Sequence, residues 1–148
     1  FDNNVPEERY TVPLGKAKIV KIGSDLTLVT ISASVADAFE AAQNLEYQGV
    51  SVEIIDLRTI RPMDYQLIFE SVKKTNRLVI LEESWPFGNI STEITYQVQN
   101  EIFDYLDAPI EKINTADTPA PYSPVLLKEW LPNYDDVIKA VKKVMYHK

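Results

Sequence analysis

The stretch Val52-Glu53-Ile54-Ile55-Asp56-Leu57-Arg58-Thr59-Ile60-Arg61-Pro62-Met63-Asp64 decides the fold of this chain. It begins as an apolar run rich in β-branched residues, which is typical of a buried parallel strand. It continues as a basic turn that Pro62 ends, and Asp64 then stands as a helix N-cap ahead of apolar residues at helical spacing. Residues 52–74 therefore predict a strand, a loop and a helix, which form one half of a βαβ unit.

The same alternation of strand and helix extends along the rest of the chain. The pattern predicts strands at 17–21, 26–31, 52–56, 78–81 and 110–113. It predicts helices around 35–45, at 64–74, from about Asn89, and from 133–136 to the carboxy terminus. Gly49 is expected to end the first helix, Ser34 and Asp37 to cap its start, and the proline-rich segment 115–124 to be a loop.

Strands that alternate with helices of ten or more residues predict an α/β fold. We expect a three-layer α/β/α sandwich whose five-stranded sheet is mostly parallel, with strand 17–21 as one antiparallel edge strand. The length of 148 residues fits one domain. Residues 1–10 read as a linker from a missing upstream domain, and residues 11–148 as the domain itself.

Composition narrows the function. The net charge of −7 argues against a nucleic-acid partner, because little positive charge is available to neutralise phosphates. No apolar run is long enough to cross a membrane, so we expect no membrane partner. The absence of cysteine excludes disulfides and thiolate metal sites, and it suits a cytoplasmic-type compartment.

The sequence offers no self-sufficient catalytic site. The single histidine, His147, stands beside the carboxy terminus and reads as a solvated tail residue. The four glycines are isolated, so neither a dinucleotide nor a Walker-type phosphate loop is present. No serine lies in a nucleophile-elbow pattern. We therefore expect no catalytic, cofactor-binding or metal-binding residue in this chain.

The loop Glu82-Glu83-Ser84-Trp85-Pro86-Phe87-Gly88 follows a predicted parallel strand, at the sheet edge where α/β proteins place functional loops. An acidic pair is costly to bury, so at least one carboxylate should face solvent or a cation. Trp85, Pro86 and Phe87 are either ordinary loop packing or an aromatic anchor at a subunit interface. Arg58 and Arg61 are either solvated or paired with carboxylates of a neighbouring subunit.

Several motifs, in order, resemble one family. They are the opening stretch, Leu14-Gly15-Lys16-Ala17, Glu40-Ala41-Ala42, Ser71-Val72-Lys73-Lys74-Thr75-Asn76-Arg77, Leu106-Asp107-Ala108-Pro109 and Ala116-Asp117-Thr118-Pro119-Ala120-Pro121-Tyr122. Together they resemble the carboxy-terminal domain of the β subunits of pyruvate dehydrogenase and other 2-oxoacid dehydrogenases, which also closes transketolase-like chains. Asn89-Ile90-Ser91 departs from the glycine-rich sequence of many relatives.

The resemblance implies an assembly and docking domain of an enzyme that oxidatively decarboxylates pyruvate and acetylates the lipoyl group of an acyltransferase. It implies thiamine diphosphate and Mg²⁺ in the full enzyme but not in this chain, because the diphosphate motif is absent. The implied partners are an α subunit, a second β subunit and the subunit-binding domain of the dihydrolipoyl acyltransferase. The implied location is the bacterial cytoplasm, with the mitochondrial matrix as the alternative.

Within the family, Asp107 and the terminal carboxylate, here on Lys148, are the implied docking contacts for the acyltransferase. Asp107 also reads as a turn residue before Pro109. Two other functions stay open. The domain resembles that of branched-chain or acetoin dehydrogenases as well, and a stand-alone binding module of flavodoxin-like architecture is the alternative outside this enzyme class.

Overall fold

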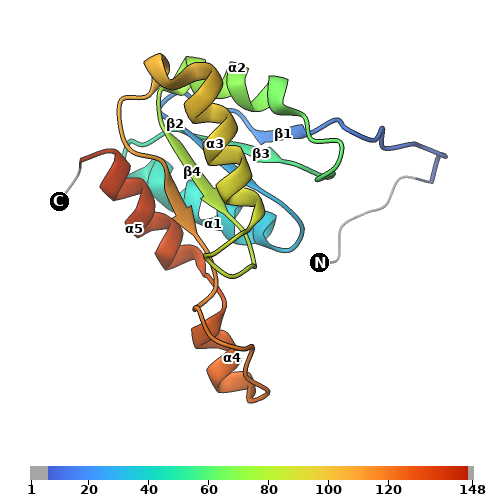
Figure 1. Cartoon of the computed structure of the whole chain (residues 1–148), viewed down its shortest axis with the longest axis vertical. Coiled ribbons are helices and arrows are strands. Elements are labelled where there is room, and N and C mark those ends of the chain that lie inside the picture. Colours follow the sequence, from blue (N-terminus) through green and yellow to red (C-terminus); the bar gives the residue numbers. More distant parts are fainter. Residues whose placement is uncertain (1–6, 147–148) are drawn as a thin grey trace.

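The computed structural model describes residues 7–146 and contains a single five-stranded sheet between helices (Figure 1). The strands are β1 (Lys18–Lys21), β2 (Leu26–Thr30), β3 (Val52–Asp56), β4 (Leu78–Leu81) and β5 (Glu111–Ile113). The helices are α1 (Ser34–Tyr47), α2 (Tyr65–Thr75), α3 (Ile90–Ile102), the short 3₁₀ helix η1 (Phe103–Tyr105), α4 (Pro124–Trp130) and α5 (Tyr134–Val144).

The strand order is β1-β3-β2-β4-β5. Strand β1 runs antiparallel to β3, and the other three pairings are parallel. The predicted fold class, a mostly parallel three-layer sandwich with one antiparallel edge strand, is therefore confirmed. Because β3 and β4 lie on opposite sides of β2, the loops that follow these strands meet at one edge of the sheet.

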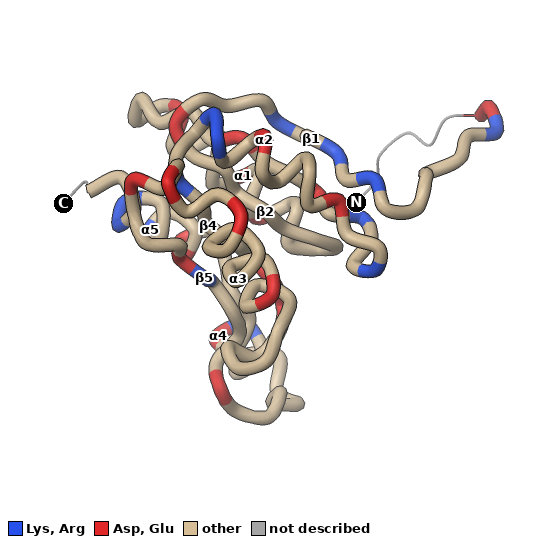
Figure 2. Tube along the Cα trace, turned by 45° about the horizontal axis from the view of Figure 1, so that its top comes forward, with Lys and Arg blue, Asp and Glu red and all other residues tan. Residues whose placement is uncertain are grey.

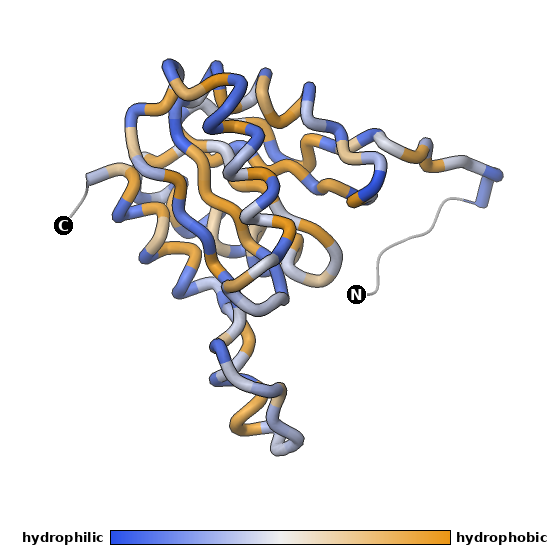
Figure 3. The backbone as a smooth tube through the Cα atoms, in the orientation of Figure 1, coloured by the Kyte–Doolittle hydropathy of each residue, from blue (hydrophilic) through white to orange (hydrophobic). Residues whose placement is uncertain are grey.

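Two apolar cores lie on the two faces of the sheet. Helices α1 and α5 pack over one face, where Leu28, Ile54 and Val141 are fully buried. Helices α2 and α3 pack over the other face, around Ile55, Val72 and Ile94. Figure 3 shows hydrophobic residues along the central strands, as expected for a sheet covered on both sides.

Most of the predicted helix boundaries agree with the structure. Asp64 caps α2, since its carboxylate accepts a hydrogen bond from the main-chain N–H of Leu67. Asn89 caps α3 in the same way, and Asn133 forms a capping box with Asp136 at the start of α5. Gly49 follows α1 with φ of +81°, a conformation that favours glycine.

The predicted cap of α1 is wrong. The N-cap residue is Ala33, no side chain caps the helix, and the buried Ser34 hydroxyl instead donates to Glu83 Oε1 at 3.5 Å. The cap prediction used local sequence alone, whereas Ser34 lies close to the loop that follows β4.

The segment 115–124 is a loop, as predicted, but the helix α4 that follows it was not predicted. Residues 115–131 form an arm that projects away from the sheet (Figure 1). Helix α4 has seven residues and none of them is buried. It therefore does not pack a buried face on the core, as the other α-helices do.

Candidate interaction surfaces

The loops that follow β2, β3 and β4 meet at the carboxyl edge of the sheet. Ser32, Ile60 and Ser84, one from each loop, line the same cavity of about 260 Å³. The structure therefore brings the loop that carries Arg58 and Arg61 next to the loop that carries Trp85, Pro86 and Phe87. This proximity is set by the strand order and is not visible in the sequence.

The acidic pair at this edge divides into one buried and one exposed residue. Glu82 is only 4% exposed, and its carboxylate accepts hydrogen bonds from the Ser91 N–H at 2.8 Å and from Asn114 Nδ2 at 3.2 Å. Glu83 is exposed. The expectation that at least one carboxylate faces solvent is confirmed, and the first turn of α3 stabilises the buried one.

Trp85 and Phe87 lie on the surface. Trp85 is 54% exposed, although its indole N–H donates to the Thr118 carbonyl at 3.0 Å, and Phe87 is 90% exposed. The Pro86 carbonyl accepts a hydrogen bond from Lys112 Nζ at 3.1 Å. The loop is thus fixed by polar contacts while its two aromatic rings stay largely in solvent.

The arm, residues 115–131, extends this apolar surface. Trp130 Nε1 donates to the same Thr118 carbonyl at 2.9 Å, so both tryptophans hold the base of the arm. Further out, Tyr122, Val125 and Leu126 are exposed. Contiguous exposed apolar residues of this kind mark protein contact surfaces.

Arg58 and Arg61 differ in their surroundings. Arg58 has φ of +57°, and its Nε lies 3.9 Å from Asp56 Oδ2, so it already has a carboxylate partner within the domain. Arg61 is exposed, precedes a cis-proline, and lines a cavity of about 660 Å³ with Tyr65 and Glu93. Burial, and then the charge of Glu93, raise the pKa of the Tyr65 phenol.

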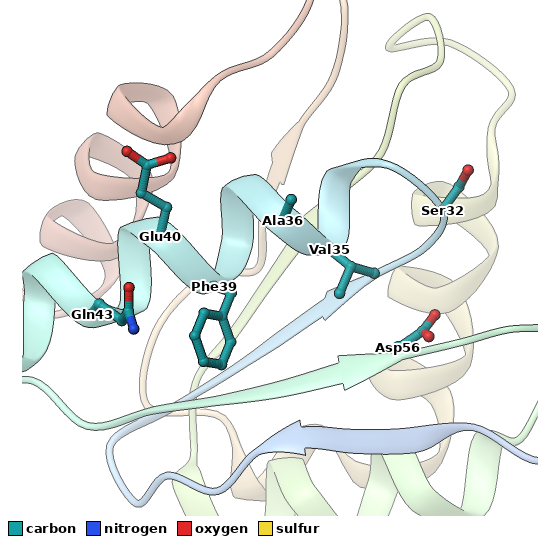
Figure 4. A pocket seen from close by; sticks show the side chains of 7 residues that line it. All are labelled: Ser32, Val35, Ala36, Phe39, Glu40, Gln43 and Asp56. Atoms are coloured by element: carbon teal, nitrogen blue, oxygen red, sulfur yellow. The ribbon is translucent and has the colours of Figure 1, made fainter. Parts of the chain in front are cut away.

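A cavity of about 870 Å³ lies between α1 and the end of β3 (Figure 4). The Phe39 side chain points from α1 toward the sheet. Asp56 is the last residue of β3, and Ser32 lies just after the end of β2. Glu40 and Asp56 are the charged residues of its lining. Two carboxylates without a cation do not suit a phosphate-bearing ligand.

The described residues do not fit thiamine diphosphate. Two cavities at the carboxyl edge carry Asp56, Glu82 and Glu83, and these carboxylates repel a diphosphate. In the third, the charge of Arg61 is offset by that of Glu93. The N-terminus of α3, where an anion would be held, is already used by the Glu82 carboxylate. Among residues 7–146, no three His, Cys, Asp or Glu side chains are grouped so as to hold a metal ion.

Asp107 lies at the opposite, amino edge of the sheet, beside the residues that lead into β4. Its main-chain N–H donates to the Asn76 carbonyl at 2.9 Å, and its carbonyl accepts from the Tyr146 hydroxyl at 3.1 Å. Its side chain is 58% exposed, with Oδ2 at 3.7 Å from Arg77 Nη2. The main chain of Asp107 holds a turn while its carboxylate faces solvent, so the two interpretations of this residue are compatible.

A second feature of the amino edge was not predicted. A cavity of about 400 Å³ lies there, lined by Asp107 itself, by Gln99 and by apolar side chains between the end of α3 and the start of β5. Phe103 in its wall is 58% exposed. In the sequence, Phe103 does not continue the apolar spacing of Ile94, Val98 and Ile102, which indicates an exposed aromatic ring. Nothing in the sequence indicates that Leu106 and Ile110 line a cavity.

The other predicted docking residue, Lys148, lies outside the described residues, as does His147. Within residues 7–146, the helices are all too short or too polar to cross a membrane.

The fold agrees with a comparison against known families. Residues 15–137 match the model of the transketolase C-terminal domain, and the chain belongs to this family. The chain is 50% identical over 144 residues to the pyruvate dehydrogenase E1 component subunit beta of Rickettsia felis, which covers 97% of this chain and 44% of that protein. The chain thus spans less than half the length of this relative.

One further sequence relative and one solved structure are also similar to this chain. The β subunit of acetoin:2,6-dichlorophenolindophenol oxidoreductase from Bacillus subtilis is 43% identical over 141 residues, which is 95% of this chain and 40% of that protein. Among solved structures, a split-gene transketolase described as an inactive β₄ tetramer superposes with a TM-score of 0.81 at 27% identity. The match covers 98% of this chain and 45% of that one.

Proposed function

We propose that this chain is the assembly and docking domain of a pyruvate dehydrogenase β subunit, part of an enzyme that oxidatively decarboxylates pyruvate and acetylates the lipoyl group of an acyltransferase. The observation that carries the proposal is the separation of two surfaces. The aromatic loop and the arm lie at the carboxyl edge of the sheet, and Asp107 lies at the amino edge. One domain can therefore contact neighbouring subunits and the acyltransferase at the same time.

The carboxyl edge is the proposed subunit interface. Trp85, Pro86 and Phe87 would pack against the α subunit or the second β subunit, and Arg58 and Arg61 would pair with carboxylates there. The exposure of both aromatic rings supports this assignment, because a monomeric domain rarely leaves them in solvent together. Arg61 is the stronger candidate for an ion pair, because Arg58 already lies near Asp56.

The amino edge is the proposed docking site. Asp107, together with the terminal carboxylate of Lys148, would bind basic residues of the subunit-binding domain of the dihydrolipoyl acyltransferase. Thiamine diphosphate and Mg²⁺ would be held by the rest of the enzyme, since the carboxylates at this domain's carboxyl edge do not fit a diphosphate. The proposed location is the bacterial cytoplasm or, alternatively, the mitochondrial matrix, and residues 1–10 would link to an upstream domain.

A second candidate is the same domain of an acetoin dehydrogenase. The observation in its favour is the 43% identity to the β subunit of the Bacillus subtilis acetoin oxidoreductase. The identity to the pyruvate dehydrogenase subunit is higher, at 50%. The docking surface would serve either enzyme, because nothing in its chemistry depends on whether the substrate is pyruvate or acetoin. Turnover of the full enzyme with pyruvate and with acetoin separates the two.

The docking role is tested with Asp107→Asn in the enzyme assembled from the α and full-length β subunits. The amide keeps the turn-forming shape of Asp107, so unfolding should change by less than about 1 kcal/mol. Binding of the acyltransferase's subunit-binding domain, measured by surface plasmon resonance at two salt concentrations, should weaken at low salt and lose part of its salt dependence. Equal affinity and equal salt dependence would leave Asp107 as a turn residue only.

A further inference from the structure

The cavity that Asp107 helps to line is open at the surface, and apart from Asp107 and Gln99 its lining is apolar. Its walls come from Gln99 and Phe103 at the end of α3, and from Leu106, Pro109 and Ile110 in the turn that leads to β5. We name this cavity, of about 400 Å³, the Asp107 socket. Its volume exceeds that of a single aliphatic side chain, so a protruding residue of a partner can enter it.

The segment of chain that forms the socket carries only negative charges. Residues 99–110 include Glu101, Asp104 and Asp107 but no lysine or arginine. Figure 2 shows acidic residues along α3, and basic residues along β1 and at α5. A cationic partner is therefore favoured at this edge.

Two cations near the socket are engaged within the domain. Lys73 Nζ lies 5.3 Å from the centre of the Tyr105 ring. Arg77 lies 3.7 Å from Asp107 and donates through Nε to the Val144 carbonyl at 3.2 Å. The Arg77 side chain is mostly buried, whereas the Asp107 side chain is mostly exposed. Arg77 therefore contacts the carboxylate from the protein side, and the solvent side of the carboxylate is open to a partner.

We infer that the docking partner inserts an aliphatic side chain into the Asp107 socket while a neighbouring lysine or arginine of the same segment pairs with Asp107. This inference rests on the proposed docking function and adds a requirement to it. Because the socket adjoins Asp107 directly, the two partner residues must lie close together. On a helix they would be three or four positions apart, which places both on one face.

The test uses the enzyme assembled from α and full-length β subunits, with the subunit-binding domain of the acyltransferase as the probe. Phe103→Ser removes a wall of the socket, and Phe103→Leu keeps it apolar. Tyr47→Ser is the matched control, since Tyr47 is 94% exposed on α1, away from the socket. Asp107→Asn reports independently on the charge contact. Affinity is measured by calorimetry at two salt concentrations, with a melting curve for each variant.

We expect Phe103→Ser to weaken binding about tenfold or more, as truncation of an aromatic interface residue does, without changing the salt dependence. Phe103→Leu should stay within about threefold of the wild type, and Tyr47→Ser should bind as the wild type does. If Asp107→Asn weakens binding while Phe103→Ser does not, the socket inference fails and the docking function stands. If neither substitution changes binding, the docking function itself fails. A loss for Phe103→Ser together with a comparable loss for Tyr47→Ser would also overturn the socket.

Discussion

At the scale of single residues, Gly23 shows how closely the turn between β1 and β2 packs on the sheet. Gly23 is buried, and its N–H donates to the carboxylate of Glu53 at 3.3 Å. A Cβ at this position would lie 2.2 Å from the main-chain atoms of Val52 and Glu53. Glycine is therefore required here by the close approach of two backbones.

Gly23→Ala should destabilise the domain by about 3 kcal/mol or more, because the clash is with backbone that cannot move aside cheaply. Gly49→Ala is the control. Gly49 has φ of +81°, but a methyl group added there would meet no atom within 4 Å, so only the backbone strain of about 1 kcal/mol applies. Urea unfolding of both variants measures the difference. Equal losses would mean that the turn relaxes to accept a side chain.

Glu53 is the second instructive residue, because it interrupts an apolar strand yet is 1% exposed. Its carboxylate accepts a hydrogen bond from Ser71 Oγ at 2.6 Å and pairs with Lys74 Nζ. The hydroxyl of Ser71 also contacts that of Thr27 at 2.6 Å. The strand was predicted correctly because β-branched neighbours dominate it. The partners of Glu53 come from α2 and from the turn at Gly23, and they could not be inferred from the local sequence.

At the scale of elements, prediction succeeded where an element packs on the core. Strands β2, β3 and β4 are almost wholly buried, so each appears in the sequence as an apolar run. Helix α4 buries none of its residues and was missed. The cap of α1 was assigned wrongly for a related reason, since the Ser34 hydroxyl is used by Glu83 from another loop.

Helix α1 also carries a carboxyl that responds to pH. Burial, and then the charge of Glu40, raise the pKa of Asp37 above its ordinary value of 3.8. The folded state thus favours the protonated carboxyl. Protonated Asp37 contributes fully to stability below the pKa that this carboxyl has in the unfolded chain. The contribution is lost as the pH rises through the higher pKa that Asp37 has in the folded domain.

Asp37→Asn should therefore gain stability relative to the wild type as the pH rises from about 3 to about 6, since the amide has no proton to lose. Thermal unfolding of both proteins across this range measures the difference in melting temperature. A difference that is independent of pH, or that changes in the opposite direction, would mean that Asp37 is not perturbed in the way described.

At the scale of the whole molecule, the two edges of the sheet carry different surfaces. Trp85 and Arg61 follow strands in the sequence, and the parallel topology brings their loops to one edge. Asp107 precedes β5 and so lies at the other edge. The Asp107 socket was not predictable, because it depends on how the end of α3 meets the turn before β5.

The most direct test of the account is the mass of the enzyme assembled from α and full-length β subunits, measured by sedimentation velocity for Trp85→Ala and for Asp107→Asn. We predict that Trp85→Ala shifts the assembled enzyme toward smaller species, because a central aromatic anchor contributes about 2 kcal/mol or more to association. Asp107→Asn should leave the mass unchanged, and the melting temperature of this domain should hardly change in either variant.

The opposite pattern would contradict the account. If Trp85→Ala leaves the assembly intact and instead lowers the melting temperature of the domain, Trp85 serves to hold the arm through Thr118 and the carboxyl edge is not the subunit interface. If Asp107→Asn dissociates the enzyme, the amino edge holds the subunits together and the separation of assembly from docking is wrong.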